Sequence, residues 1–256
     1  MDLNYLLKTN LRQIEEAFIN KNILPGNVNY TRFLILTRAR TGSNLLISYL
    51  NNHPNIRAYG EVFGNIGNKN IQDLIDIVYS KKSHITKSVG FKIFYYHPND
   101  SKSQDIWDYL LSDIRIKVIH LKRKNLLRSL VSELIAYKTN IWKEIHVGNS
   151  IKSDQKKIYV DVNSLINQIN QNLEWIESFE KKFKEHDSMN INYEDLVKNP
   201  DSTLNSIFSF LQVKKIKVSS FLQKQNPEKL EDLIINYSEL SKHLKKNKLD
   251  KYLSMS

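Results

Sequence analysis

Hydrophobic residues along this chain follow two different spacings. Short apolar runs that end in turn-forming residues are typical of buried parallel strands, and they occur at 33–36, 88–96 and 116–121. Apolar residues recur every three or four positions, as in amphipathic helices, over 3–18, 44–50, 71–79, 105–112, 126–137 and 165–183. Strands that alternate with helices predict an α/β fold of three layers, in which helices flank a mostly parallel central sheet.

Weaker signals complete the prediction. Residues 158–162 and 188–192 read as short strands, 193–196 as a turn, and 202–211 and 231–244 as helices. The polar, irregular stretch 141–157 predicts a flexible segment over the active site. We expect one domain, 1–256, that opens with an N-terminal helix and connector, 1–28.

Composition narrows the possible functions. Without cysteine, the chain has no disulfides, thiolate metal sites or thiol catalysis, and its seven histidines form no evident metal-ligand cluster. Because no apolar stretch is long enough for a transmembrane helix and the start does not resemble a signal peptide, we expect a cytoplasmic protein. A net charge of +11 fits either nucleic-acid binding or a basic cleft for a small polyanion. Much of this charge is scattered lysine, which is typical of a solvated surface.

The most informative stretch joins the first predicted strand to the next helix. It reads Thr37-Arg38-Ala39-Arg40-Thr41-Gly42-Ser43, and Asn44 opens the helix. A strand, a glycine-containing loop and a helix start direct several N–H groups and the helix dipole at one spot. With the charge of Arg40 and the hydroxyls of Thr41 and Ser43, the loop is suited to hold a phosphate or sulfate. It is not the nucleotide P-loop, which requires Gly-Lys-Ser/Thr at its end.

The pattern T-x-x-R-T-G-S-x-L-L resembles the phosphosulfate loop of sulfotransferases that use 3′-phosphoadenosine 5′-phosphosulfate (PAPS). With HPNI and GEVF downstream, it is most similar to the bacterial carbohydrate and lipopolysaccharide branch. The resemblance implies a P-loop-like sulfotransferase fold, PAPS as donor without a metal, and a carbohydrate or glycolipid hydroxyl as acceptor. It implies that the loop from Arg38 to Asn44 binds the donor, with Arg40 also catalytic, and that a later loop with Lys224 covers the nucleotide.

A second motif, K-R-K-N-L-L-R-S-L-V-S, follows the third predicted strand. Basic residues again meet a helix start, and Ser132 lies two helical turns after Lys124 on the same face. This resembles the family's 3′-phosphate site, in which an arginine precedes a serine by eight residues. Here Lys124 replaces that arginine and Arg123 precedes it, so the resemblance leaves either or both as the phosphate ligand.

The reaction requires a base that accepts a proton from the acceptor hydroxyl. Glu61, between Gly60 and Val62-Phe63, is our first choice, because its apolar setting suits a base and the resemblance implies this role. His97, at the end of the second strand, is the alternative. Lys92, within that strand, either reaches the sulfate, supports Glu61, or faces water from an edge strand.

Two other classes of function fit the sequence less well. A kinase that uses ATP would need the missing P-loop lysine and an acidic residue after a strand. A basic nucleic-acid-binding protein would explain the net charge but not two anion sites at two strand ends, and no DNA- or RNA-binding signature is present.

Overall fold

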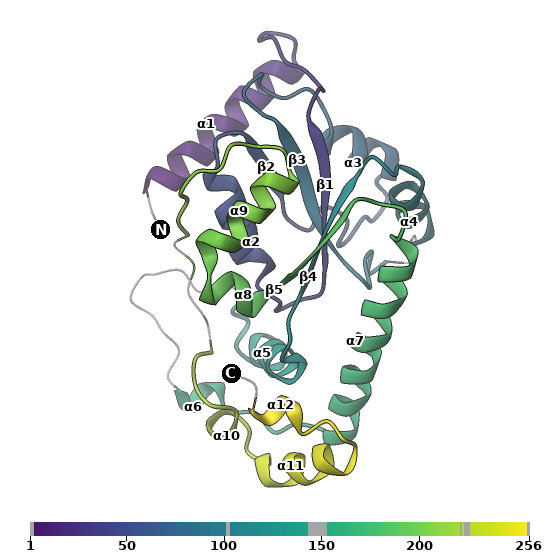
Figure 1. Ribbon diagram of the computed structural model, residues 1–256, viewed down its shortest axis with the longest axis vertical. Coiled ribbons are helices and arrows are strands. Elements are labelled where there is room, and N and C mark those ends of the chain that lie inside the picture. The colour runs from purple at the N-terminus through teal and green to yellow at the C-terminus, as the bar shows by residue number, and fades with distance from the viewer. Residues whose placement is uncertain (1–2, 101–102, 143–152, 221, 223–225, 255–256) are drawn as a thin grey trace.

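A computed structural model of the protein describes residues 3–100, 103–142, 153–220, 222 and 226–254 (Figure 1). Its centre is a sheet of five strands in the order β2-β3-β1-β4-β5. Every pairing is parallel. The strands are β1 (Thr31–Thr37), β2 (Ile56–Tyr59), β3 (Ser88–Phe94), β4 (Lys117–Lys122) and β5 (Ser188–Asn192). The predicted parallel α/β sheet is therefore confirmed, and β1, which leads into the anion loop, is its middle strand.

Helices cover both faces of the sheet. They are α1 (Leu3–Asn20), α2 (Ser43–Asn52), α3 (Ile71–Val78), α4 (Ser103–Ser112), α5 (Leu126–Thr139), α6 (Ser153–Lys156), α7 (Val162–Lys182), α8 (Tyr193–Lys198), α9 (Pro200–Phe210), α10 (Leu230–Leu233), α11 (Tyr237–Lys246) and α12 (Lys251–Ser254). The apolar run of β1 explains the two faces, because successive side chains point to opposite sides. Phe33 and Ile35 pack with α2, α8 and α9, whereas Leu34 and Leu36 pack with α3, α4 and the end of α7.

A further apolar cluster lies beyond the end of the sheet. There α5 and the first half of α7 pack against α10, α11 and α12, which lie together at the bottom of Figure 1. These helices lie at the carboxyl ends of the strands, so they form one wall of the space in front of the anion loop. Their packing fixes α5, which carries the second half of the second basic motif.

Three local predictions were wrong. Residues 158–162 form no sheet strand: Ile158 makes one isolated bridge to Ile234, and Val162 already begins α7. The alternation there arises because Ile158 and Val160 are buried in the cluster of α5, α7 and α10–α12, while β5 occupies the edge of β4. The extended residue Ile234 also divides the predicted helix 231–244 into α10 and α11, and the predicted turn 193–196 is helical, as α8.

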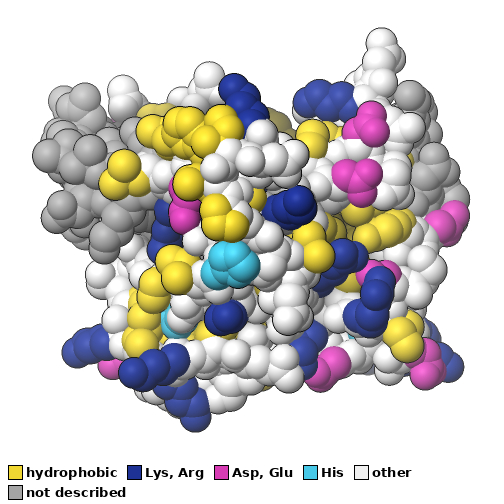
Figure 2. Space-filling view, turned by 90° about the horizontal axis from the view of Figure 1, so that it is seen from above, with side chains coloured by type: hydrophobic (Ala, Val, Ile, Leu, Met, Phe, Trp, Pro, Cys, Tyr) yellow, Lys and Arg dark blue, Asp and Glu magenta, His cyan; other side chains and the backbone are white. Residues whose placement is uncertain are grey.

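Charged side chains are spread over the surface that Figure 2 shows. Seen from the top of Figure 1, basic, acidic and hydrophobic side chains are interspersed on that face of the molecule (Figure 2). No helix in the described residues is both long and apolar enough to cross a membrane.

Candidate active site

The anion loop occupies the turn between β1 and α2, with Gly42 at the helix start. Gly42 has a φ of 83°, a backbone conformation that side chains disfavour. A Cβ at this position would lie 2.3 Å from the Tyr193 ring. Because glycine has no side chain that could cap α2, the first N–H groups of the helix are left for a ligand. The loop therefore requires glycine for its conformation and for contact with Tyr193.

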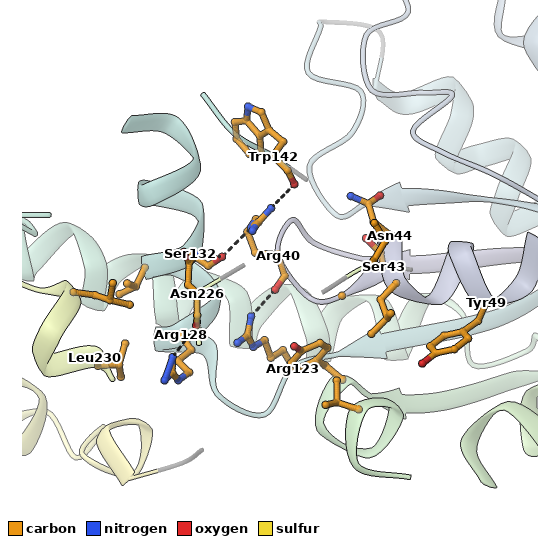
Figure 3. A pocket seen from close by; sticks show the side chains of 17 residues that line it. Arg40, Ser43, Asn44, Tyr49, Arg123, Arg128, Ser132, Trp142, Asn226 and Leu230 are labelled. Atoms are coloured by element: carbon orange, nitrogen blue, oxygen red, sulfur yellow. Dashed lines mark hydrogen bonds between the residues drawn. The ribbon is translucent and has the colours of Figure 1, made fainter. Parts of the chain in front are cut away.

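A cavity of about 260 Å³ opens at this helix start (Figure 3). We call it the first cavity. It is lined by loop residues 40 and 42–45, by one face of α5, and by Arg123, Tyr193, Trp142, Asn226 and several apolar side chains. Three arginines, Arg40, Arg123 and Arg128, line it, so the two basic motifs of the sequence meet at one place.

Arg40 belongs to the anion loop and lines the first cavity. It has a φ of 64°, which is uncommon for any residue other than glycine and is characteristic of functional loops. Its Nε donates a hydrogen bond to Ser132 Oγ at 2.9 Å, and its terminal nitrogen donates to the carbonyl of Trp142 at 2.8 Å (Figure 3). Burial lowers the pKa of Arg40, and the neighbouring Arg123 lowers it further. Both guanidinium groups nevertheless stay charged at neutral pH and repel each other. An anion bound beside Arg40 and Arg123 would reduce this repulsion.

Arg123 crosses from the end of β4 to the loop. It donates a hydrogen bond to the Arg40 carbonyl at 2.9 Å and lies over the Tyr193 ring at 4.6 Å. Burial lowers its pKa. Its buried Nε finds no hydrogen-bond partner among the described residues, which is unusual for a charged side chain. The arginine is therefore held in place with a donor still to be satisfied.

Lys124 differs from Arg123 although the two are adjacent. Its ammonium pairs with Asp195 at 3.2 Å, and its side chain is half exposed. It does not line the first cavity, whereas Arg123 does. The geometry thus favours Arg123 over Lys124 as the ligand of an anion in this cavity.

Ser132 connects the anion loop to the late part of the chain. Its hydroxyl accepts hydrogen bonds from Arg40 Nε and from Asn226 Nδ2, the latter at 3.1 Å. Arg128, one turn before it on α5, donates to the Glu228 carbonyl at 2.6 Å and so fixes the segment after Asn226. Lys224, the residue expected to cover the nucleotide, lies outside the described residues.

Two predicted donor ligands point away from the first cavity. The Thr41 hydroxyl is buried, donates to the Arg38 carbonyl at 2.9 Å and lies 2.5 Å from the Thr37 hydroxyl. Arg38 is buried, forms an ion pair with Glu133 and donates to Ser129 Oγ at 3.3 Å. Both side chains stabilise the loop from within, because their polar groups are bound to other protein groups and not turned to the cavity.

Glu61 is linked to the loop through Lys92. The Lys92 ammonium, with a side chain only 3% exposed, lies 2.9 Å from Glu61 Oε1 and 2.7 Å from Asn44 Oδ1. The alternative in which Lys92 faces water from an edge strand is therefore wrong, because β3 is an inner strand and its lysine turns inward. The expected apolar setting of Glu61 is also wrong, since its side chain is 42% exposed and lies beside a cation.

His97 lies behind Glu61. Its Nε2 is 3.9 Å from Glu61 Oε2, and its Nδ1 accepts the Phe94 N–H at 3.3 Å. Burial lowers the pKa of His97 to about 4, so the ring is neutral at neutral pH. Because Nδ1 is an acceptor, Nε2 carries the proton and faces Glu61 as a donor. This geometry favours Glu61 over His97 as a base.

Sequence reasoning missed two residues of the first cavity. Arg128 lies midway between Lys124 and Ser132 at helical spacing, so the periodicity that selected Ser132 could have found it. Tyr193 belongs to the stretch 193–196, which the sequence predicts only as a turn. No local signal reveals its contact with Arg123 and Gly42, since β5 brings it there across the sheet.

Comparison with known proteins decides the family. A family model described as the sulfotransferase domain matches residues 30–256, which is most of the chain. The chain belongs to the sulfotransferase family. This sulfotransferase is similar to Nodulation protein H of Rhizobium tropici, with 25% identity over 233 residues that cover 82% of this chain and 88% of the relative.

One solved structure shows the same fold. The crystal structure of a sulfotransferase from Alicyclobacillus acidocaldarius has 15% identity and a TM-score of 0.52, and covers 88% of this chain and 96% of that one. A sulfotransferase domain from the curacin biosynthetic pathway matches with 17% identity, 72% and 75% coverage and a TM-score of 0.41. The family model confirms the predicted family, the Alicyclobacillus structure confirms the P-loop-like fold, and the chain is an enzyme of sulfuryl transfer.

The described residues contain no group of three or more His, Asp or Glu side chains arranged to hold a metal ion. The charged side chains that line the first cavity are arginines, which suit an anionic ligand.

Proposed function

We propose that this sulfotransferase moves a sulfuryl group from PAPS to a hydroxyl of a carbohydrate or glycolipid, and that residues 1–256 act as one domain. The observation that carries the proposal is the meeting of two arginines from two strand ends at one cavity. Arg40 and Arg123 are joined by the hydrogen bond at 2.9 Å and both line the first cavity. A donor with phosphates at two positions suits two such cationic centres.

The residues fit such a donor in two groups. At the start of α2, the N–H groups that follow Gly42, with Ser43 and Arg40, are suited to its 5′ end. Arg123, with its unsatisfied buried Nε, and Ser132 are suited to its 3′-phosphate. When bound, PAPS would supply a sulfuryl group on a phosphate leaving group. Arg40 would stabilise the negative charge that develops there.

Glu61 is the group that we assign to the acceptor proton. Its carboxylate is open to solvent on one side, whereas Lys92 and His97 hold it from the other. Asn44 lines the first cavity and binds Lys92, so the base is tied to the helix start that would bind the donor. Lys92 and His97 are positioning residues in this arrangement, because each acts through Glu61. The carbohydrate class of the acceptor rests on the sequence resemblance of the GEVF and HPNI stretches.

The proposal is tested by thermal stabilisation with adenosine 3′,5′-bisphosphate (PAP), the product that PAPS would leave. We expect a clear rise in melting temperature with PAP and little with ATP or 5′-AMP, because these lack the 3′-phosphate. Arg123→Met should abolish the PAP effect, and Lys124→Met is the matched control that should keep it. Equal shifts with all three nucleotides, or a loss in the control alone, would contradict the assignment.

A further inference from the structure

A second cavity, of about 310 Å³, lies on the opposite face of α5 from the first. Six of its lining residues define it here: Arg38, Tyr96, Glu133, Gln171, Asn172 and Trp175. The α5 residues of the first cavity are 128, 131 and 132, whereas those of the second are 130, 133, 134 and 137. At 100° per residue these two sets fall on opposite sides of the helix. Its size is at the lower end for small-molecule sites, roughly 300 Å³.

The second cavity adjoins the reacting groups. Its Arg38 belongs to the same loop as Arg40, two residues earlier. Tyr96 forms another link, because its hydroxyl accepts the Ala39 N–H at 3.3 Å while its ring meets the His97 ring edge-on at 5.5 Å. One side chain thus touches the cavity, the anion loop and the ring behind Glu61. A molecule in this cavity would lie beside Arg38 of the anion loop, and Tyr96 and His97 would stand between it and Glu61.

The walls combine aromatic rings with amide groups. Tyr96 and Trp175 form a tilted ring pair with centroids 5.6 Å apart. On α7, Gln168, Gln171 and Asn172 also line the cavity. The amide nitrogen of Asn172 donates to the Gln168 carbonyl at 2.6 Å, which leaves Oδ1 as an acceptor. Flat apolar faces with amide donors and acceptors around them suit a ring that carries hydroxyl groups.

Two buried polar atoms in this wall lack partners. Neither Asn172 Oδ1 nor Arg38 Nε finds a hydrogen bond among the described residues, although Asn172 is 2% and Arg38 4% exposed. One is an acceptor and the other a donor, and a hydroxyl group can satisfy either kind. Both atoms are covered, so a ligand would use them after a rotation of the side chain. The charge of Arg38 is balanced by Glu133, which favours an uncharged ligand.

From these observations we infer that the second cavity binds a neutral pyranose unit of the acceptor. This inference rests on the proposed function and names the substrate class that the same reaction would take. Gln171, Asn172 and Trp175 then determine acceptor specificity, whereas donor binding depends on the first cavity.

The test uses saturation-transfer NMR to measure the binding of cellobiose, maltose and lactose to the full chain saturated with PAP. We expect transfer to the pyranose protons of at least one disaccharide. Gln171→Ala and Trp175→Ala should each weaken that binding by about tenfold, because the first removes a hydrogen bond of about 1–1.5 kcal/mol and the second removes a stacked ring. Asn170→Ala, an exposed change on the same helix outside the cavity, is the control and should leave it unchanged.

The outcomes separate the two proposals. If none of the three disaccharides binds, the pyranose site is overturned even when PAP still raises the melting temperature. The same holds if the Gln171 and Trp175 variants bind a disaccharide as tightly as the unchanged protein does. Absence of a PAP shift overturns the donor assignment instead. Trp175 is half-buried and Gln171 lies at an exposed position, so both variants can be checked for folding by the same melting curve.

Discussion

Gly42→Ala tests whether the anion loop is held by its contact with Tyr193. The structure places two demands on this position: the backbone has a φ of 83°, and a Cβ would lie 2.3 Å from the Tyr193 ring. The same ring supports the guanidinium of Arg123 at 4.6 Å. An added methyl group must therefore either strain the loop or displace the ring from beneath Arg123.

Gly67 offers a matched comparison for the magnitude. It too has a positive φ, 61°, but a Cβ there would meet no atom within 4 Å. Both alanine variants carry the left-handed backbone penalty of about 1–2 kcal/mol. Only Gly42→Ala adds overpacking, which costs about 1–3 kcal/mol. For a protein of this size, 1 kcal/mol corresponds to about 2–4 °C, so Gly42→Ala should melt roughly 2–12 °C below Gly67→Ala.

The assay is a melting curve for each variant, with and without PAP. Displacement of Tyr193 would also remove the cation–π support of Arg123, about 0.5–2 kcal/mol, and weaken PAP binding roughly 2- to 30-fold. Tyr193→Ala in the Gly42→Ala background should be non-additive, because the clash is then absent. Equal melting temperatures and equal PAP shifts for Gly42→Ala and Gly67→Ala would show that the ring does not constrain the loop.

Three further predictions concern the charged and titratable groups. Arg40→Ala should lower kcat by about 10²–10³-fold, as removal of a transition-state donor does, with exposed Arg115→Ala as the control; full activity in Arg40→Ala would refute its role. Glu61→Gln should lower kcat/KM by about 10²–10⁴-fold, and a loss below about tenfold would transfer the role of base to His97. Burial lowers the pKa of His97 and His120 to about 4 from 6.5, so the unfolded chain takes up protons first as pH falls from 6.5 to 4. Stability should therefore fall across that window and be unaffected by these rings above it, and His120→Gln should flatten the dependence of melting temperature on pH; an unchanged slope would contradict this.

The fold and the anion loop were accessible from local patterns. A parallel strand that is buried on both faces must be apolar throughout, and a helix with one buried face must repeat every three or four residues. Both signals survive in the bare sequence, so the alternation of strands and helices around a parallel sheet could be predicted, although 158–162 was wrongly predicted as a strand. The spacing from Lys124 to Ser132 likewise predicted one face of α5, because it depends only on helix geometry.

The direction of each side chain within those segments was decided by the tertiary structure. Arg38 and Arg40 look equivalent in the sequence, but the ion pair with Glu133 turns the first inward while Ser132 holds the second at the first cavity. Similarly, the choice of Arg123 over Lys124 depends on Tyr193, which β5 delivers from a distant part of the chain. The periodicity of hydrophobic residues predicts which face of a helix or strand is buried. It does not predict which residue contacts that face, because this depends on how the elements pack together. For that reason the sequence alone could indicate an anion loop and a base, whereas the link from Asn44 through Lys92 to Glu61 required the folded chain.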